Sequence, residues 1–246
     1  MPQSWQGSSL IPNILNIPNI PKIIAHRGAS FDFPELSYEA YMGALAQGAD
    51  GFECDIRLTR DHHLVLWHDA DMVRLAGHKG KISRMRLSEI QSHSPVMTLD
   101  QLFHIAVNSK RDLFLETKHP VPTGGVVEKE IITYLDAYSS TIEKSGISIR
   151  LMSFSRRAIK RFSHSSFPSM QIVKDFRTLS KVKTRDVGVG IFLLRQKPHL
   201  LQELKSAGHN IHVWTVDEPN DAIWLQGQGV SSIITNRPAM IRAALS

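Results

Sequence analysis

Cysteine is nearly absent from this sequence of 246 residues, which contains only Cys54. A single cysteine cannot form a disulfide within the chain, and no Cys-x-x-Cys pair is present for structural zinc or thiol exchange. Secreted domains often depend on several disulfides, whereas proteins of a reducing compartment do not. The sequence therefore predicts a cytoplasmic protein that is held together by a hydrophobic core.

Long apolar runs are also missing. The apolar segments at residues 64–67 and 191–194 have the length of a strand, far below the roughly 18 residues of a membrane-spanning helix. The first 21 residues contain no Lys or Arg, and prolines interrupt their apolar positions, so they lack the basic and apolar regions of a signal peptide. We expect residues 1–21 to form an N-terminal extension, and we expect no stable membrane insertion.

Blocks of like charge are absent as well, although the chain is basic. Its 29 Lys and Arg residues exceed its 23 Asp and Glu residues, which gives a formal net charge of +6. No five consecutive residues carry one sign of charge, and the aromatic residues do not alternate with a basic stretch as a nucleic-acid stacking surface requires. The composition, with 42% hydrophobic residues, excludes collagen-like, coiled-coil and disordered chains. The net charge suits an anionic substrate, nucleic acid or an acidic membrane surface, and charge alone does not decide among them. We expect a globular protein with a basic surface and no nucleic-acid partner.

What is present is an alternation of short β-rich segments with helical patterns, which is typical of βα units around a parallel sheet. Eight such units predict an α/β fold, a TIM (β/α)8 barrel over residues 22–246. The polar, poorly periodic residues 69–95 are expected to form a small insertion after the second strand region. The predicted barrel strands cover residues 22–26, 52–58, 113–118, 147–154, 170–173, 188–192, 211–216 and 232–234, and the predicted helices include residues 37–47, 99–108, 155–162, 199–207, 220–228 and 237–245.

The alternative fold is an open doubly wound sheet, but such a sheet normally carries a Gly-rich phosphate turn, and none is found in the sequence. A barrel concentrates its chemistry at the carboxyl ends of its strands, so polar side chains at those positions are candidates for function.

Several polar residues follow this rule. Glu53 and Asp55 lie two residues apart on the second strand, so their side chains share one face. With Glu116 near the end of the third strand, they form a set of oxygen ligands that suits Mg²⁺ or Ca²⁺ better than zinc. His26 ends the first strand and His68 follows the second, and histidine is suited to general acid and base catalysis near neutral pH.

Each of these residues also has a simpler interpretation. A His at a strand end often only forms a hydrogen bond, a Glu-x-Asp pair usually lies on a solvated face, and Lys118 beside Glu116 can form an ordinary ion pair. The combination argues against these interpretations. Apolar segments such as residues 23–25 and 113–115 become polar only at their ends, and a barrel interior does not accommodate polar groups without compensation.

Taken together, the motifs resemble the glycerophosphodiester phosphodiesterase family in order and spacing. The resemblance covers nearly all of the chain from Lys22 onward, and the combination is specific although each motif alone is weak. The matching segments are His26-Arg27-Gly28-Ala29, Pro34-Glu35, residues 48–56, Thr59-Arg60-Asp61, His68-Asp69 and residues 115–118, 153–155, 214–217 and 233–238.

This resemblance implies a TIM barrel that hydrolyses glycerophosphodiesters to glycerol 3-phosphate and an alcohol with a divalent cation, Mg²⁺ or Ca²⁺. The residues at matching positions are Glu53, Asp55 and Glu116 as metal ligands, His26 and His68 as the acid–base pair, Arg27 and Lys118 as phosphate contacts, Glu35 as a contact to metal-bound groups or the glycerol, and Phe154 and Trp214 as apolar positions at the mouth.

The chain departs from the family pattern at three positions. Leu36 replaces a usual Asn, which removes a polar amide close to the site. His62 stands at a turn position that is commonly Gly, at a cost of about 1 kcal/mol in backbone strain. Asp217 stands where Asn is frequent and is expected to add negative charge near the mouth. None of these changes removes a metal ligand or a catalytic His.

Two other functions are compatible with the same sequence. The same site could act on lysophospholipids as a lysophospholipase D, or the barrel could bind phosphodiesters or a protein partner without catalysis. The presence of all three carboxylates and both histidines favours an active enzyme.

Overall fold

The computed structural model describes residues 20–246, so most of the extension predicted for residues 1–21 lies outside the described residues. Within the described part, eight parallel strands close into a barrel, because the first strand pairs with both the second and the last. The TIM barrel is therefore confirmed, and the open sheet is excluded. The barrel strands are β1 (Lys22–His26), β2 (Gly51–Leu58), β6 (Asp112–Thr117), β7 (Ile149–Ser153), β8 (Ser169–Val173), β9 (Asp186–Gly190), β10 (Asn210–Trp214) and β11 (Ser232–Thr235).

Both faces of the barrel strands are covered, which explains why their sequences are almost continuously apolar. In β1, for example, Ile24 belongs to the cluster inside the barrel, while Ile23 and Ala25 pack in the clusters between strands and helices. The interior cluster forms a closed apolar layer across the barrel. Its members are Ile24, Phe114, Met152, Met170, Ile172 and Ile234, with Phe154 and Trp214 packed on it.

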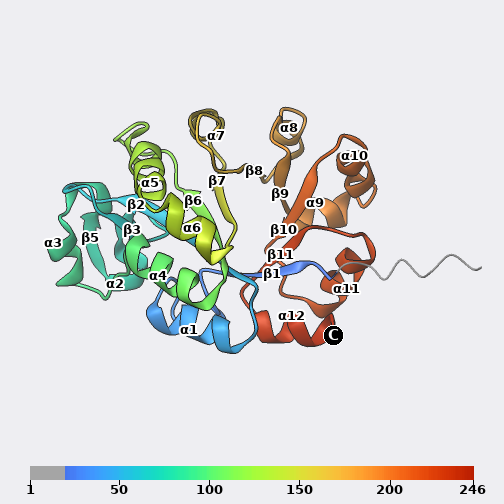
Figure 1. Cartoon of the computed structure of the whole chain (residues 1–246), viewed down its shortest axis with the longest axis horizontal. Helices are drawn as coiled ribbons and strands as arrows, with labels where there is room; N and C mark the ends of the chain where they lie inside the picture. Colours follow the sequence, from blue (N-terminus) through green and yellow to red (C-terminus); the bar gives the residue numbers. More distant parts are fainter. Residues whose placement is uncertain (1–19) are drawn as a thin grey trace, which may run out of the picture.

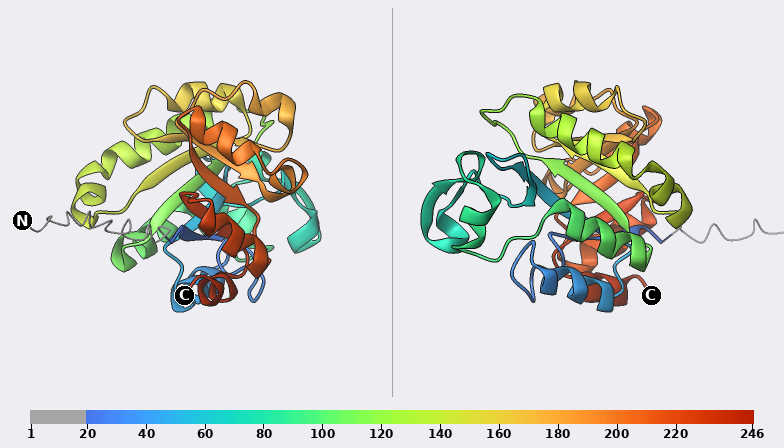
Figure 2. Two further views of the ribbon diagram at one scale, coloured as in Figure 1. Left: turned by 90° about the vertical axis from the view of Figure 1, so that its right-hand side faces the viewer. Right: turned by 60° about the vertical axis from the view of Figure 1, so that its left-hand side comes forward.

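Helices surround the barrel (Figures 1 and 2). Ser37 caps the first of these helices, because its side chain accepts a hydrogen bond from the Ala40 N–H. No helix among residues 20–246 is long and apolar enough to cross a bilayer. The helices of this layer are α1 (Tyr38–Ala46), α4 (Leu99–Ser109), α5 (Val126–Ala137), α6 (Ser139–Ser145), α7 (Arg156–Phe162), α8 (Phe176–Leu179), α9 (Ile191–Gln196), α10 (Leu200–Ser206), α11 (Pro219–Gly227) and α12 (Pro238–Ala244).

The segment between β2 and α4 leaves the barrel and forms a lobe of its own, which projects beside the barrel in the right view of Figure 2. Its first strand runs antiparallel to β2 and extends the barrel sheet. Trp67, Met72 and Ile82 belong to a separate apolar cluster within the lobe. The lobe contains β3 (Leu64–Leu66), β4 (Asp71–Met72), α2 (Val73–Ala76), β5 (His78–Lys81), the 3₁₀ helix η1 (Ile82–Arg84) and α3 (Leu87–Gln91).

One predicted strand is wrong in part. The sequence predicts a strand over residues 188–192, but β9 ends at Gly190 and α9 begins at Ile191. Ile191 and Leu194 are buried and Phe192 is exposed, as on a helix with one face against the core. A run of four apolar residues does not distinguish a buried strand from a buried helix, which is why the pattern misleads here. The short helices α6 and α8 were not predicted either.

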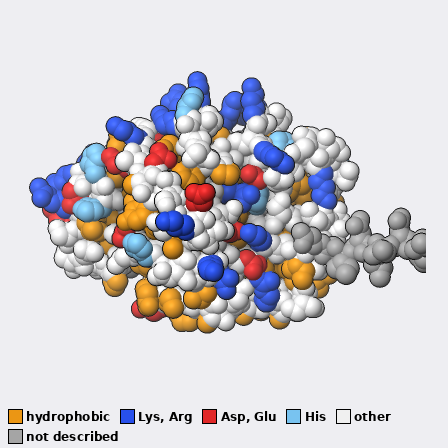
Figure 3. Space-filling model, viewed as in Figure 1, with side chains coloured by type: hydrophobic (Ala, Val, Ile, Leu, Met, Phe, Trp, Pro, Cys, Tyr) orange, Lys and Arg blue, Asp and Glu red, His pale blue; other side chains and the backbone are white. Residues whose placement is uncertain are grey.

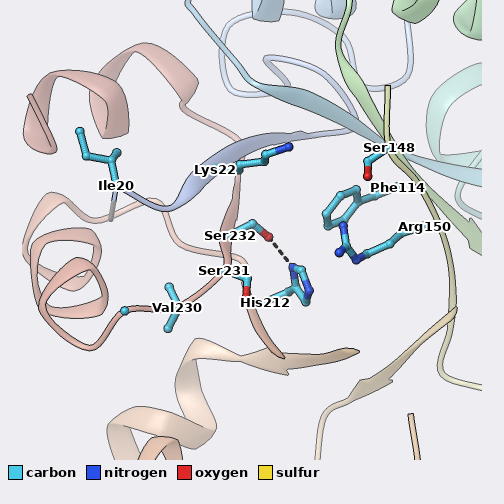
Figure 4. Close-up of a pocket in the computed structure, with 10 residues that line it drawn as sticks. Ile20, Lys22, Phe114, Ser148, Arg150, His212, Val230, Ser231 and Ser232 are labelled. Atoms are coloured by element: carbon cyan, nitrogen blue, oxygen red, sulfur yellow. Dashed lines mark hydrogen bonds between the residues drawn. The ribbon is translucent and has the colours of Figure 1, made fainter. Parts of the chain in front are cut away.

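Polar side chains close the amino-terminal end of the barrel (Figure 4). His212 donates from Nε2 to Asp186 Oδ1 at 3.2 Å, so its Nδ1 accepts from Ser232 Oγ at 2.7 Å. Arg150 lies 3.4 Å from the second oxygen of Asp186 and covers the Phe114 ring. Burial alone would raise the pKa of Asp186, but His212 and the Arg150 charge lower it to about 2. The network borders a cavity of about 460 Å³.

Candidate active site

The register of the barrel brings the predicted carboxylates and His26 together at the carboxyl ends of the strands. His26 of β1 lies opposite Glu53 of β2, and Asp55 lies opposite Glu116 of β6. Because side chains alternate along a strand, Glu53 and Asp55 both face inward, while Cys54 packs in the outer core. One carboxylate oxygen from each of the three acidic residues lies within 4.8 Å of the others.

Two cations balance this buried acidic cluster. Arg27 Nε lies 2.8 Å from Asp55 Oδ2, and Lys118 Nζ lies 2.8 Å from oxygens of both Asp55 and Glu116. Burial raises the pKa of Asp55, but Lys118 and Arg27 outweigh this effect and hold the pKa below its usual value. Burial and the neighbouring Asp55 raise the pKa of Glu116 to about 7, and the same two causes raise that of Glu53.

The carboxylate cluster fits a divalent cation. Its three donors are hard oxygens at neighbouring strand ends, and Glu53 Oε1 accepts no hydrogen bond from any described residue although it is fully buried. A buried carboxylate oxygen without a partner costs free energy that a bound ion would offset. The sequence expectation of a Mg²⁺ or Ca²⁺ ligand set at Glu53, Asp55 and Glu116 therefore agrees with the geometry.

His26 is held by a chain of hydrogen bonds that the sequence analysis did not anticipate. Asn236 donates from Nδ2 to Asp217 Oδ2 at 2.6 Å, which turns its Oδ1 toward His26 Nδ1 at 2.7 Å. An amide oxygen only accepts, so His26 carries its proton on Nδ1 and leaves a lone pair on Nε2. This Nε2 lies 3.9 Å from Glu53 Oε2. Burial and the Arg27 charge lower the pKa of His26 to about 4.

His68 lies beyond β3, at the base of the lobe. Its Nδ1 donates to Asp69 Oδ1 at 2.8 Å, and Arg57 donates twice to the His68 carbonyl, at 2.7 and 3.0 Å. The pKa of His68 is lowered by burial and by the charges of Lys118 and Arg27, and these effects outweigh the opposing charge of Asp55. The charges of Asp55, Lys118 and Arg27 thus act on the pKa of His68, and its catalytic role stays a prediction.

Glu35 connects the barrel to the lobe. Its carboxylate lies 3.3 Å from Arg27 Nη1 and 2.6 Å from Arg74 Nη2, and Arg74 also contacts Asp69 at 2.6 Å. The turn before Glu35 requires Gly28, because a Cβ at this position would lie 2.6 Å from the Ala40 backbone and φ is +82°. The structure thus places Glu35 beside the predicted phosphate-contacting Arg27.

An aromatic cluster borders the carboxyl end of the barrel. Phe154 and Trp214 pack edge to face with ring centroids 5.4 Å apart, on top of the interior apolar layer. Phe192 extends the cluster at 6.0 Å from Trp214, and Lys174 Nζ lies 5.9 Å from the Phe154 ring. The two predicted mouth residues are thus in contact with each other, and Phe192 joins them.

The three departures from the family pattern have structural consequences. Leu36 has a left-handed φ of 60° and its side chain is buried in the outer core, so an apolar side chain suits this position. His62 has a φ of 63°, as expected for a turn position that is commonly Gly. The Asp217 carboxylate accepts hydrogen bonds from Thr235 Oγ1 and from the backbone and side-chain nitrogens of Asn236.

Sequence reasoning assigned no role to Asn236 and did not anticipate that Asp217 would accept hydrogen bonds from it. Asn236 directly follows β11 and Asp217 lies shortly after β10, so both satisfy the strand-end rule used for the carboxylates. The sequence does not show that these two residues are hydrogen-bonded to each other, because that contact depends on the close approach of neighbouring strand ends.

Comparison with known proteins agrees with this geometry. The sequence model of the Glycerophosphoryl diester phosphodiesterase family matches residues 26–240. The chain is similar to a probable glycerophosphodiester phosphodiesterase 1 of Mycobacterium tuberculosis, with 33% identity over 92% of both chains. It is also similar to a glycerophosphodiester phosphodiesterase of Caldanaerobacter subterraneus, with 26% identity over 88% of this chain and 94% of the relative.

Solved structures share the fold. A phosphodiesterase of Oleispira antarctica, in complex with the product sn-glycerol-3-phosphate, has a TM-score of 0.75 and 21% identity, and the match covers 92% of this chain and 97% of that one. A glycerophosphoryl diester phosphodiesterase of Agrobacterium tumefaciens, described as putative, reaches a TM-score of 0.80 at 21% identity, over 92% and 98% of the two chains. The chain therefore belongs to the glycerophosphoryl diester phosphodiesterase family and is a phosphoric diester hydrolase.

Proposed function

We propose that the carboxyl end of the barrel hydrolyses glycerophosphodiesters to glycerol 3-phosphate and an alcohol with a divalent cation and two histidines. The observation that carries this proposal is the grouping of three buried carboxylates with His26, Arg27 and Lys118 at one end of the barrel. The product found in the Oleispira antarctica relative supports the choice of glycerol 3-phosphate.

Glu53, Asp55 and Glu116 would hold the cation, Mg²⁺ or Ca²⁺. When bound, it neutralises charge on the nonbridging phosphate oxygens and lowers the pKa of a coordinated hydroxyl. Arg27 and Lys118 lie beside the same carboxylates and supply further positive charge for the phosphate.

His26 is assigned as the base of the first step. Its Nε2 takes the proton of the glycerol 2-hydroxyl as that oxygen attacks phosphorus, and its Nδ1–H remains bonded to Asn236. His68 gives a proton to the oxygen of the departing alcohol. Water then opens the cyclic phosphate, with His68 as base and His26 as acid. Both histidines are held through Nδ1, so the assignment rests on their partners. The partner of His26 is a neutral amide and the pKa of His26 is lowered to about 4, which favours the neutral base. The partner of His68 is the Asp69 carboxylate, which favours the protonated acid.

The substrate's glycerol and alcohol groups would contact different sides of the site. Glu35, held between Arg27 and Arg74, is positioned to accept hydrogen bonds from glycerol hydroxyls. Phe154 and Trp214 offer apolar surface to the alcohol moiety at the mouth. A lysophospholipid would extend the same contacts, so it is the second substrate to test.

The proposal is tested by measuring release of glycerol 3-phosphate from glycerophosphocholine by the full-length protein, with Mg²⁺, with Ca²⁺ and with a chelator. We expect turnover only with cation. Glu53→Gln and His68→Ala are each expected to lower kcat at least 100-fold, because the first removes a ligand charge and the second removes a proton donor.

A matched control is His164→Ala, because His164 is an exposed histidine that follows α7, and its side chain forms no hydrogen bond or ion pair within the described residues. Its kcat should equal that of the unmodified protein. Turnover that persists in the chelator would contradict the cation requirement. If lysophosphatidylcholine alone is cleaved, the site is a lysophospholipase D, and failure of every phosphodiester would favour a binding role.

We further propose a cytoplasmic location and a single catalytic domain over residues 22–246, with residues 69–95 as its insertion. The location is supported by Cys54, a lone and buried thiol that needs no oxidising compartment. Cell fractionation with an antibody to the chain tests this location, and recovery outside the cytoplasmic fraction would contradict it.

A further inference from the structure

The positive charge of this protein is concentrated in one part of the fold. Residues 150–185 contain ten Lys and Arg residues and a single acidic residue, Asp175, which amounts to a formal charge of +9. This exceeds the +6 of the whole chain, so the remainder is net acidic. The segment includes α7, β8 and α8, and Figure 3 shows Lys and Arg side chains gathered along the edge that these two helices form.

Most of these cations have no partner. Arg150 pairs with Asp186 and Arg161 with Glu128, but the other eight Lys and Arg residues are exposed and form no ion pair with any described residue. Asp175 offers little compensation, because its carboxylate caps α8 by accepting from the Thr178 N–H. Unpaired like charges on one surface repel each other, and an anionic partner would relieve that repulsion.

Five of the unpaired cations converge on one groove between α7 and the segment before β9. The groove has a volume of about 580 Å³, and Gln171 lies at its base. Its walls place two groups of cations opposite each other across space that is large enough for a phosphate-bearing headgroup. The cations are Arg156, Arg157, Lys160, Lys181 and Lys183.

The basic face continues to the mouth of the barrel. Lys174 follows β8 and lies over the Phe154 ring, and Phe154 packs against Trp214. Phe176 and Arg177 follow on α8, and Phe176 is 41% exposed. An exposed aromatic side chain among cations is typical of a surface that enters the headgroup region of a bilayer.

We propose that this basic face, formed by α7, α8 and residues 181–185, docks the protein reversibly on an anionic phospholipid bilayer. Five of the unpaired cations line the groove, and Lys174, Arg177 and Arg185 lie outside its lining. The positive charge therefore extends beyond the groove over a wider face, which suits a charged surface more than a single small ion. Nucleic acid is the less favoured partner, because Phe176 is the only strongly exposed aromatic residue on this face and bases need several for stacking. Docking would hold the mouth next to the bilayer.

The test is co-sedimentation of the full-length protein with vesicles of phosphatidylcholine that contain 30% phosphatidylglycerol, against vesicles of phosphatidylcholine alone. We expect binding to the anionic vesicles at 0.1 M NaCl and its loss at 0.5 M, because salt shortens the range of the attraction. The triple variant Lys160→Glu, Lys181→Glu, Lys183→Glu is expected to bind about 100-fold more weakly, since each cation near an anionic bilayer contributes roughly fivefold in affinity.

A matched control makes the same change in net charge elsewhere. Lys79, Lys81 and Lys144 are exposed, lie on β5 and α6, and form no ion pair within residues 20–246, so replacing all three by Glu should leave most of the binding intact. Glu53→Gln should bind vesicles as the unmodified protein does, which separates this proposal from the proposed catalysis. Both triple variants should keep their thermal unfolding temperature.

Four results would overturn the proposal: no binding to anionic vesicles, equal binding to neutral vesicles, equal losses in the two triple variants, or tight binding of single-stranded poly(U) RNA without vesicle binding. The last result would assign the basic face to nucleic acid. Phe176→Ser adds an independent measurement, because removing the exposed ring should weaken vesicle binding several-fold even where salt has weakened the charge attraction.

Discussion

At the scale of single residues, Asn236 is the least expected part of the site. It contacts no predicted metal ligand directly, yet its amide oxygen decides which nitrogen of His26 carries the proton. Asp217 fixes the orientation of that amide by accepting its Nδ2–H. We therefore regard Asn236 and Asp217 as positioning residues for His26.

Asn236→Leu should lower kcat for glycerophosphocholine 10- to 100-fold while KM changes less than about threefold. The side chain keeps its approximate size but can no longer accept the His26 Nδ1–H, so the imidazole samples the wrong tautomer and orientation. Steady-state kinetics at saturating cation measure both parameters.

The exchange of the pair, Asp217→Asn with Asn236→Asp, serves as the control for this prediction. It keeps one amide and one carboxylate at the two positions and restores an acceptor for His26, so it should recover most of the kcat lost in Asn236→Leu. Unchanged kcat in Asn236→Leu would show that His26 needs no support from Asn236.

At the scale of elements, Asp186 shows how one buried charge connects neighbouring strands. It begins β9, accepts from His212 of β10 and pairs with Arg150 of β7, which lies two strands away. The network lies at the amino-terminal end of the barrel, beside the interior apolar layer. Breaking such a pair leaves the remaining charge buried without compensation.

Asp186→Ala should lower the free energy of unfolding by about 3 kcal/mol at pH 7. Because the pKa of Asp186 is lowered to about 2 in the folded protein, its ionised form stabilises the fold above the usual pKa of 3.8. This contribution is lost as the pH falls from about 4 towards 2. The difference in unfolding free energy between the unmodified protein and Asp186→Asn should therefore shrink over that range. Urea unfolding at pH 7, 4 and 3 measures both effects.

Asp136→Ala is the matched control, because Asp136 is exposed on α5 and its side chain makes no hydrogen bond or ion pair within the described part of the chain. Its unfolding free energy should stay within about 0.5 kcal/mol of the unmodified value. A loss in Asp186→Ala no larger than in this control would mean that the network contributes nothing to stability.

Elements also differ in how well a sequence predicts them. The barrel strands were found because burial on both faces leaves a continuous apolar run of distinctive length. The end of β9 was misplaced because Gly190 and Ile191 continue the same apolar composition from a strand into a helix. The helices α6 and α8 span seven and four residues, which is too short for a periodic pattern.

At the scale of the whole molecule, the acidic cluster couples ligand binding to stability. Three carboxylates at the carboxyl end repel one another, and raised pKa values at Glu53 and Glu116 report part of that cost. A cation that binds only the folded chain stabilises it by about 2.7 kcal/mol at a concentration of 100 times its Kd.

We therefore expect the unfolding temperature to rise by about 5–10 °C between a chelator and saturating Mg²⁺ or Ca²⁺. Differential scanning calorimetry measures the shift and ranks the two cations. Glu116→Gln should lose most of the shift. Equal unfolding temperatures in cation and chelator would contradict a metal site at these carboxylates.

The sequence alone determined the fold class and predicted the three carboxylates and two histidines, since strand-end polarity and apolar strand interiors are local properties of the sequence. The roles predicted for Arg27, Glu35, Phe154 and Trp214 came from the family resemblance. Tertiary structure decided what depends on neighbours distant in the chain. Asn236 reaches His26 across 210 positions because β11 and β1 are adjacent in the barrel. The basic face is similar in origin, because its cations are scattered along residues 156–185 and become one surface only when the barrel places α7 and α8 along the same edge of the molecule.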